Sequence, residues 1–329
     1  MTNSTDIFLG IDGGGTKCKA RLEDAHGNLL AEATSGPANA ARHLTGSVTA
    51  VLEASEKAIA SANIEGLTLN HIHAGIGLAG INIPQVKHAF LKQSLPFASW
   101  QITTDLHIAC LGAHLGQDGA IVIVGTGSSG IAIHNGHQLE VGGHGFVVGD
   151  KGSGAWLGKM AISHCLETLD GITPNNPFCE QVMGLLNCDN AYDLVSLTLE
   201  AKPVFYASIA PLIFQLATSQ QEEALLLVNQ AASYINKICQ RLLRGNLNRL
   251  SLIGGITQPL LPYLDSQIQA IIQPAKATPE QGAILYAKSK LTSSIIVKNT
   301  SMAQQGAQSP NVMAPQVGLD PCEPLGLKK

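Results

Sequence analysis

Two glycine-rich turns, each placed between two strand-like runs, constrain the fold of this chain more than any other feature. The first is Asp12-Gly13-Gly14-Gly15-Thr16-Lys17, and the second is Gly125-Thr126-Gly127-Ser128-Ser129-Gly130. Each turn follows an apolar run and leads into another strand rather than into a helix. Glycines after a strand let backbone N–H groups approach an anion, and the neighbouring Thr, Ser and Lys side chains add donors for phosphate oxygens. Two such turns in one chain predict a clamp around one polyphosphate.

The predicted order of strands and helices also repeats. The first copy has the order βββαβαβα, and the second restarts the same plan with helices inserted into it. In the first copy we expect strands at 7–12, 17–22, 29–34, 72–78 and 100–104, and helices at 45–62, 84–95 and 106–115. In the second copy we expect strands at 120–124, 131–133, 137–141 and 250–253, helical segments within 151–244, and a closing helix at 283–290.

This repetition and the chain length predict an α/β fold with two domains. A chain of 329 residues is longer than a single core usually grows. We expect domains at 1–117 and 118–291, with the ligand in the cleft between them. Residues 292–329 are rich in Ser, Gln, Pro and Gly, which predicts a disordered tail.

Charge and composition limit the classes of partner. The net charge is −4 and the 20 Lys and Arg residues are scattered, which argues against nucleic acid. No apolar run has the length of a signal peptide or of a membrane span, so we expect no membrane partner and a cytoplasmic protein. The seven cysteines include no pair at the spacing of zinc knuckles, which predicts reduced, mostly buried thiols. His107, Cys110 and His114 share a rough helical face, but nothing nearby completes a metal shell, so a structural role is favoured.

Two better-known nucleotide motifs do not fit. Residues 125–130 match G-x-G-x-x-G, but the dinucleotide fingerprint requires a helix after the glycines, and a hairpin is predicted here. A P-loop is excluded because no Gly-Lys pair followed by Ser or Thr closes a glycine loop.

Three features at predicted strand ends carry the chemistry: Asp12, Asp105 and Gly125. Ligands of open α/β sheets bind at the carboxyl ends of strands, so we expect these residues to converge. Asp12 beside a triphosphate would best hold Mg²⁺, directly or through water, and the alternative is a turn-forming role. Asp105 is the candidate general base that accepts a proton from an attacking alcohol, and its alternative or additional role is the N-cap of the following helix.

Two further glycine-containing segments are candidates for ligand contacts. In the loop 141–154, Asp150 is suited to accept hydrogen bonds from sugar hydroxyls and His144 to pack on a ring; the alternative is a mobile linker or a helix N-cap. Gly254-Gly255 follows the strand at 250–253 and would let a purine approach the backbone.

With these residues in view, the chain resembles the sugar kinase, actin and Hsp70 superfamily of two-domain ATP-binding folds with ribonuclease H-like domains. Within it, residues 6–290 resemble the N-acetylglucosamine kinase group of the BadF/BadG/BcrA/BcrD class. The resemblance covers the phosphate motifs at 12–17 and 125–129, the adenosine motif at 252–256, the segment 103–105 with the catalytic aspartate, and sugar-contacting loops at 36–39, 77–80 and 143–154. It implies ATP contacts at Gly13, Gly14, Thr16, Lys17, Gly125, Thr126, Gly127, Ser128, Gly254 and Gly255, and sugar contacts at Asn39, Ala79, Gly80, Asp105, Gly143, His144 and Asp150.

The resemblance implies a kinase that uses ATP and Mg²⁺ to phosphorylate N-acetylglucosamine at O6. Glucosamine is the nearest alternative substrate, and animal members have Trp where His144 stands, so contacts to the acetamido group need not carry over. The alternative from a different class is an ATP-hydrolysing activator of a partner protein, although the clustered cysteines of such activators are missing. A non-catalytic sugar sensor is the third alternative. Relatives are often dimers, and the resemblance leaves a homodimer open.

Overall fold

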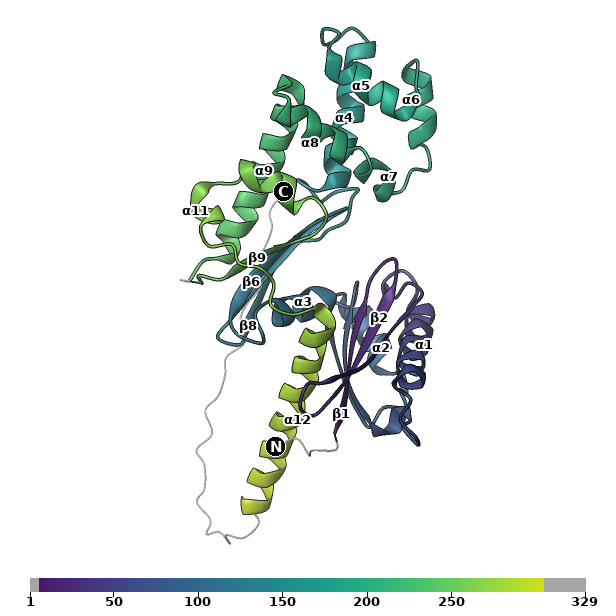
Figure 1. Cartoon of the computed structure of the whole chain (residues 1–329), viewed down its shortest axis with the longest axis vertical. Helices are drawn as coiled ribbons and strands as arrows, with labels where there is room; N and C mark the ends of the chain where they lie inside the picture. Colours follow the sequence, from purple (N-terminus) through teal and green to yellow (C-terminus); the bar gives the residue numbers. More distant parts are fainter. Residues whose placement is uncertain (1–5, 246, 305–329) are drawn as a thin grey trace, which may run out of the picture. The chain divides into compact units, whose positions relative to one another are not determined.

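The protein has an α/β fold built on two β-sheets, as the sequence predicts (Figure 1). The structure is a computed structural model, and it describes residues 6–245 and 247–304. The five-stranded sheet contains β1 (Ile7–Gly13), β2 (Cys18–Asp24), β3 (Leu29–Ser35), β4 (Ile72–Leu78) and β5 (Ser99–Thr104). The four-stranded sheet contains β6 (Gly119–Val124), β7 (Ser128–His134), β8 (His137–Gly142) and β9 (Leu250–Ile253).

The first sheet has the strand order β3-β2-β1-β4-β5. β1 is antiparallel to β2 and parallel to β4, and β4 is parallel to β5. The central strand β1 is an almost continuous apolar run in which Phe8, Leu9 and Ile11 are fully buried, as expected for a strand covered on both faces. The edge strand β3 instead alternates between more buried and more exposed positions.

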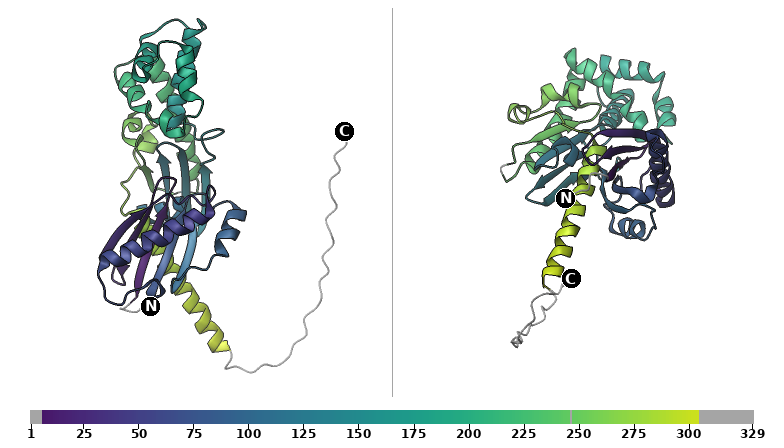
Figure 2. Two further views of the ribbon diagram at one scale, coloured as in Figure 1. Left: turned by 90° about the vertical axis from the view of Figure 1, so that its right-hand side faces the viewer. Right: turned by 60° about the horizontal axis from the view of Figure 1, so that its bottom comes forward.

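Helix α1 (Leu44–Ala62) covers one face of this sheet across β1, β2 and β3, and Figure 2 shows it crossing in front of the strands in its left view. The side chain of His43 caps its N-terminus, and Asn63 ends it in the left-handed conformation. The short helix η1 (Leu69–His71) leads into β4, and α2 (Pro84–Leu91) precedes β5.

The other face of the first sheet is packed by α3 (Asp105–Ala113) and by the beginning of α12 (Pro279–Gln304). Glycines allow this close approach: a Cβ on Gly10 would overlap the carbonyl oxygen of Glu280, and one on Gly75 would overlap that of Ala283. On its opposite side α3 packs against the second sheet through a cluster that includes Cys110, Ile121 and Ile131. Helix α3 therefore lies between the two sheets.

The second sheet has the order β8-β7-β6-β9, with β6 parallel to β9. Its far face is covered by a large helical core in which α9 contacts β6, β7 and β8. The helices of this half are α4 (Gly154–Leu169), α5 (Pro177–Leu186), α6 (Ala191–Thr198), α7 (Pro203–Ala207), α8 (Ala210–Thr218), α9 (Glu222–Leu242), α10 (Thr257–Leu260), η2 (Leu261–Tyr263) and α11 (Ser266–Gln269).

The second copy of the repeat contains the four predicted strands but is less regular than the first copy. At the position that β5 takes in the first sheet, the described part of the second sheet has an isolated parallel bridge between Leu250 and Ile272. Pro274 follows shortly after this bridge and has no N–H to donate to a sheet, so the pairing does not extend into a strand.

The closing helix also differs from its predicted range of 283–290. It begins at Pro279 and continues to Gln304, because no Gly or Pro interrupts the chain between Gly282 and Gly306. The part of the predicted tail beyond it, 305–329, lies outside the described residues.

The chain up to Lys290 forms one compact unit, and a second unit begins at Leu291. The division into domains at residues 117 and 118 stays a prediction. In the described part of the chain, no helix combines the length and apolar character needed to cross a lipid bilayer.

Candidate active site

The carboxyl ends of the three parallel strands of the first sheet meet at one edge. The register places Asp12 opposite Gly77, and Gly77 opposite Thr103. Asp105 follows two residues after Thr103, and its negative charge contributes to the raised pKa of Asp12. The predicted convergence of these two carboxylates is therefore present in the structure.

Backbone hydrogen bonds fix the loop that follows β3 against this edge. The N–H of Ala79 donates to the carbonyl oxygen of Gly13 over 2.8 Å, and the N–H of Ala40 donates to that of Ala79 over 2.9 Å. A Cβ placed on Gly80 would lie 2.9 Å from Oδ1 of Asn39, so glycine is needed for the close approach. These contacts bring together Asn39, Ala79 and Gly80, which are three of the predicted sugar-binding residues.

Asp105 is the first residue of α3, but it is not the N-cap. Thr104 is the N-cap, because its Oγ1 accepts a hydrogen bond from the N–H of His107 over 3.0 Å. Oδ1 of Asp105 accepts a hydrogen bond from the N–H of Leu106 over 2.9 Å. Burial raises the pKa of Asp105 above its usual range, and the nearby carboxylate of Glu140 adds to the increase.

Asp105 lies in a pocket of about 470 Å³ whose walls come from both sheets. Six of the seven predicted sugar-binding residues line it: Asn39, Ala79, Gly80, Asp105, Gly143 and His144. Thr104, from the predicted segment 103–105, also lines the pocket, as do Glu140 and Asn82, which are not among the residues predicted from the sequence. Glu140 gave no signal in the sequence, because a glutamate on an exposed strand is ordinary. The pocket has room for a small polar ligand beside the candidate base.

Asp150, the seventh predicted sugar-binding residue, is not part of the lining of this pocket. Its carboxylate lies above the second glycine-rich turn, where a Cβ placed on Gly127 would stand 2.9 Å from Oδ2 of Asp150. Asp150 has a positive φ of 56°, which is uncommon for a residue other than glycine. Burial raises its pKa, while the backbone groups of Ser128 and Gly145 act in the opposite direction. Its predicted role in sugar binding stays a prediction.

The second glycine-rich turn contacts the start of α4 and the Gly254-Gly255 segment. The N–H of Gly154, the first residue of α4, donates to the carbonyl oxygen of Gly125 over 2.8 Å. A Cβ placed on Gly125 would lie 4.0 Å from the backbone nitrogen of Gly255. The parallel pairing of β6 with β9 explains this proximity, because both segments follow the carboxyl end of their strand. Two parts of the predicted nucleotide site are therefore neighbours.

Parts of the first glycine-rich turn and of the Gly254-Gly255 segment face open space. A Cβ placed on Gly15 or on Gly255 would meet nothing within 4 Å. Thr16, Lys17 and Thr126 are exposed, whereas Ser128 is buried and its Oγ donates to the carbonyl oxygen of Lys151 over 2.8 Å. Thr16, Lys17 and Thr126 are thus accessible to a ligand, and Ser128 holds the turn against the loop that follows β8.

Asp12 is the most perturbed carboxyl group of the site. Burial raises its pKa to about 7, and the negative charges of Glu280 and Asp105 add to the increase. Glu280, in the first turn of α12, forms an ion pair with Lys19 over 3.2 Å. Glu280 is not among the residues predicted from the sequence, because it lies far from Asp12 along the chain. The positive charges of Lys19 and Lys17 act in the opposite direction, but the three carboxyl groups outnumber them, and a bound cation would offset the excess.

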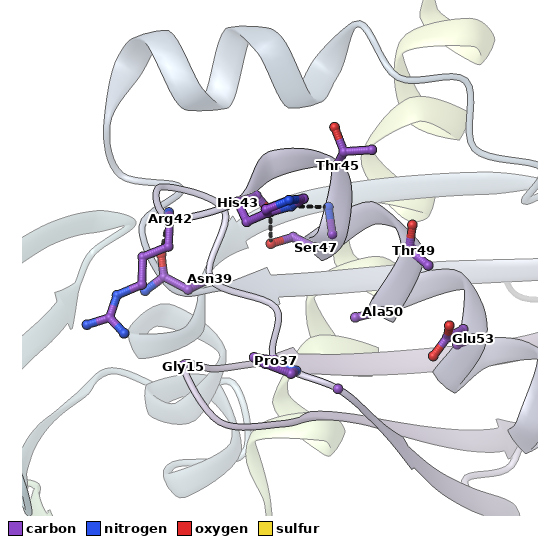
Figure 3. A pocket seen from close by; sticks show the side chains of 12 residues that line it. Gly15, Pro37, Asn39, Arg42, His43, Thr45, Ser47, Thr49, Ala50 and Glu53 are labelled. Carbon is purple, nitrogen blue, oxygen red and sulfur yellow. Dashed lines mark hydrogen bonds between the residues drawn. The ribbon is translucent and has the colours of Figure 1, made fainter. Parts of the chain in front are cut away.

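A second cavity of about 610 Å³ adjoins the first glycine-rich turn (Figure 3). Gly15 and Pro37 lie on one side of it, and the N-terminal half of α1, with Thr45 and Thr49, lies on the other. Asn39 lines both this cavity and the pocket that contains Asp105. The two spaces are therefore adjacent.

His107, Cys110 and His114 have structural partners, as expected. Nδ1 of His107 is 2.7 Å from Oγ1 of Thr103, Cys110 Sγ contacts the carbonyl oxygen of Gly119, and Nε2 of His114 is 2.9 Å from the carbonyl oxygen of Ala120. Among the residues that the structure describes, no three His, Cys, Asp or Glu side chains are grouped to hold a metal ion.

The two sheets, each with a glycine-rich turn between two of its strands, form the α/β fold expected from the sequence. Residues 9–287 match the profile of the BadF/BadG/BcrA/BcrD ATPase family, and the chain belongs to this family.

Three proteins that are similar to this chain in sequence or structure carry the names of amino-sugar kinases. A glucosamine kinase of Vibrio cholerae is 36% identical over 282 residues, which cover 86% of this chain and 96% of that protein. An N-acetyl-D-glucosamine kinase of Dictyostelium discoideum is 24% identical over 320 residues, covering 86% and 98% of the two chains. The crystal structure of a candidate N-acetylglucosamine kinase from Chromobacterium violaceum matches with a TM-score of 0.78 and 31% identity, over 87% of this chain and 100% of that chain.

Proposed function

We propose that this protein is an ATP-dependent kinase that phosphorylates the 6-hydroxyl group of an amino sugar, either N-acetylglucosamine or glucosamine. The observation that carries the proposal is the position of Asp105. It is a partly buried carboxyl group at the carboxyl end of β5, in a pocket formed by both sheets and beside the edge that holds Asp12. The similarity to kinases of both amino sugars supports the substrate class.

In this proposal Asp105 is the general base. One of its oxygens accepts the N–H of Leu106, which orients the carboxylate and leaves the other oxygen for a sugar hydroxyl. Because Thr104 caps α3, Asp105 is not needed for capping. Phosphoryl transfer has a loose transition state, so the base mainly orients the hydroxyl and accepts its proton late.

The two glycine-rich turns would hold the phosphates of ATP, with Gly254 and Gly255 beside the adenosine. The open space over Gly15 and Gly255 and the exposed donors Thr16 and Lys17 fit this assignment. Asp12 fits a role as a Mg²⁺ ligand, directly or through water, because its neighbours Glu280 and Asp105 add to the negative charge there. When bound, Mg²⁺ would neutralise charge on the phosphate oxygens.

The other parts of the sugar site follow from the pocket lining. The sugar would contact Asn39, His144 and the backbone of Gly80 and Gly143. Asp150, which packs against Gly127, would accept hydrogen bonds from sugar hydroxyls. A homodimer and a cytoplasmic location stay predictions.

The test is ADP release with Mg·ATP in the presence of N-acetylglucosamine, glucosamine, N-acetylmannosamine or glucose, with a control that contains no sugar. We expect a kcat/KM that is highest for one of the first two sugars, and a product phosphorylated at O6. ADP release that does not depend on sugar would contradict the kinase proposal and favour an ATP-driven activator of a partner protein.

A further inference from the structure

The sugar pocket contains a second carboxylate whose role the proposed function leaves open. Glu140 lies on β8 of the second sheet and faces the pocket that also contains Asp105, at the edge of the first sheet. The two groups are close enough for Glu140 to raise the pKa of Asp105, after the larger effect of burial. Two acidic groups from different sheets therefore share one ligand pocket.

The structure holds the carboxylate of Glu140 in a defined position. Oγ1 of Thr104 accepts the N–H of His107 as the N-cap of α3, so its hydroxyl proton is free to be donated elsewhere. It is donated to Oε1 of Glu140 over 3.1 Å. Oε1 is thereby tied to the start of α3, and Oε2 can accept a hydrogen bond from a ligand.

No positively charged side chain of the described residues lining the pocket balances this charge. The ionisable groups in the lining are Asp105, Glu140 and His144, and the remaining lining side chains are neutral. Bringing a ligand into such a pocket displaces water from the two acidic groups. A neutral ligand would leave both charges uncompensated, whereas a cation would pair with them.

We propose that Glu140 selects the protonated 2-amino group of a hexosamine, and that glucosamine is therefore preferred to N-acetylglucosamine. The inference rests on the proposed kinase function and deepens it. An ammonium group donates charge-assisted hydrogen bonds to a carboxylate, which are about twice as strong as those of a neutral amide. It also offsets the negative charge beside Asp105, which favours the ionised form that a general base requires. The acetamido group of N-acetylglucosamine carries no charge and offers neither effect.

The test compares Glu140→Gln with the unchanged protein. The substitution removes the charge but keeps an amide oxygen that can accept the hydrogen bond from Thr104, so the fold and the position of α3 should be retained. Glu167→Gln on α4, an exposed position outside the pocket, is the matched control. The readouts are kcat and KM with glucosamine, N-acetylglucosamine and glucose, together with the melting temperature of each protein.

We expect the unchanged protein to have a higher kcat/KM for glucosamine than for N-acetylglucosamine. Because Glu140 is solvent-exposed in the free protein, Glu140→Gln should lower the glucosamine value by about tenfold, mainly through KM, and change the values for the neutral sugars by less than about threefold. Glu167→Gln should leave all of them unchanged.

The results that overturn the inference are distinct from those that overturn the kinase proposal. A preference for N-acetylglucosamine, or an equal loss for all sugars in Glu140→Gln, contradicts the role of Glu140 and leaves the kinase intact. If Glu140→Gln leaves the ratio of kcat/KM for glucosamine to kcat/KM for the neutral sugars unchanged, the role of Glu140 is likewise contradicted and the kinase proposal stands. If no sugar stimulates ADP release in the unchanged protein, the kinase proposal fails and the selection of an amino sugar fails with it.

Discussion

The hydroxyl of Thr104 donates a hydrogen bond to Oε1 of Glu140 over 3.1 Å and so joins the end of β5 to β8 of the other sheet. Because Thr104 also caps α3, the same side chain positions the helix that begins with Asp105. The candidate base and the second acidic group of the pocket are thus positioned by one residue. A change in the packing of either sheet would alter the distance between the two carboxylates.

The role of Asp105 as general base predicts the behaviour of Asp105→Asn. An amide cannot accept the proton of the attacking hydroxyl, so turnover should fall by about 10²- to 10⁴-fold, with smaller changes in the binding of Mg·ATP and sugar. Single-turnover kinetics and calorimetric binding measure the two effects separately. Asp170→Asn, at the exposed end of α4, is the matched control and should be unaffected. Near-normal turnover in Asp105→Asn would remove Asp105 as the base.

The raised pKa of Asp12 predicts a pH dependence of stability in the free protein. The unfolded chain releases this proton near the ordinary value of 3.8, whereas the folded protein retains it up to about pH 7. The folded state therefore loses stability as the pH rises between these values, and the loss is complete above about pH 7.

Asp12→Asn has no such proton and should escape this loss. Relative to the unchanged protein it should gain stability as the pH rises, by roughly 2–4 kcal/mol above pH 7, while losing Mg²⁺-dependent turnover. Urea unfolding at about pH 4.5 and about pH 8, without nucleotide, gives the two free energies of unfolding for each protein. If the difference in free energy of unfolding between the two proteins is the same at both pH values, the raised pKa of Asp12 is contradicted.

The close approach of α12 to the first sheet predicts that Gly10→Ala destabilises the protein. The new methyl group would overlap the backbone carbonyl of Glu280, which cannot move without shifting the helix, so we expect a loss of about 1–3 kcal/mol or more. Gly184→Ala is the matched control because it lies in α5 with nothing within 4 Å of the added Cβ. It should stabilise the protein by about 0.5–1 kcal/mol through helix propensity. Thermal or urea unfolding of both variants would show whether the two substitutions have opposite signs.

The packing of Asp150 over the second glycine-rich turn predicts the effect of Gly127→Ala. The added methyl group would stand 2.9 Å from Oδ2 of Asp150 and push the carboxylate away from the turn. If Asp150 holds sugar hydroxyls as proposed, the KM for the sugar should rise about tenfold or more in Gly127→Ala and in Asp150→Asn alike. If the sugar KM is unchanged in Asp150→Asn, Asp150 does not bind the sugar and instead maintains the conformation of the turn.

Many features of the fold and the site were predictable from the sequence because they depend on local patterns. The apolar run of β1, the glycines that follow it and the helical spacing in α1 each reflect a few consecutive residues. The placement of Asp12 and Asp105 at one edge followed as well, since parallel strands end together. The predicted end of the closing helix at residue 290 was wrong, because α12 continues to Gln304 and its length depends on a longer stretch of sequence.

The sequence by itself therefore determined the α/β class, the repeated order of elements, the family and the candidate residues at the strand ends. Only the tertiary structure decided which distant side chains share the site. It brought Glu140 to Thr104 across 36 positions of the chain, placed Glu280 beside Lys19 and Asp12, and set Asp150 over Gly127 rather than in the lining of the sugar pocket. The physical reason is that the charge and burial of a carboxylate depend on its neighbours in space. Local sequence patterns carry no information about neighbours that the packing of two sheets and a helix brings together.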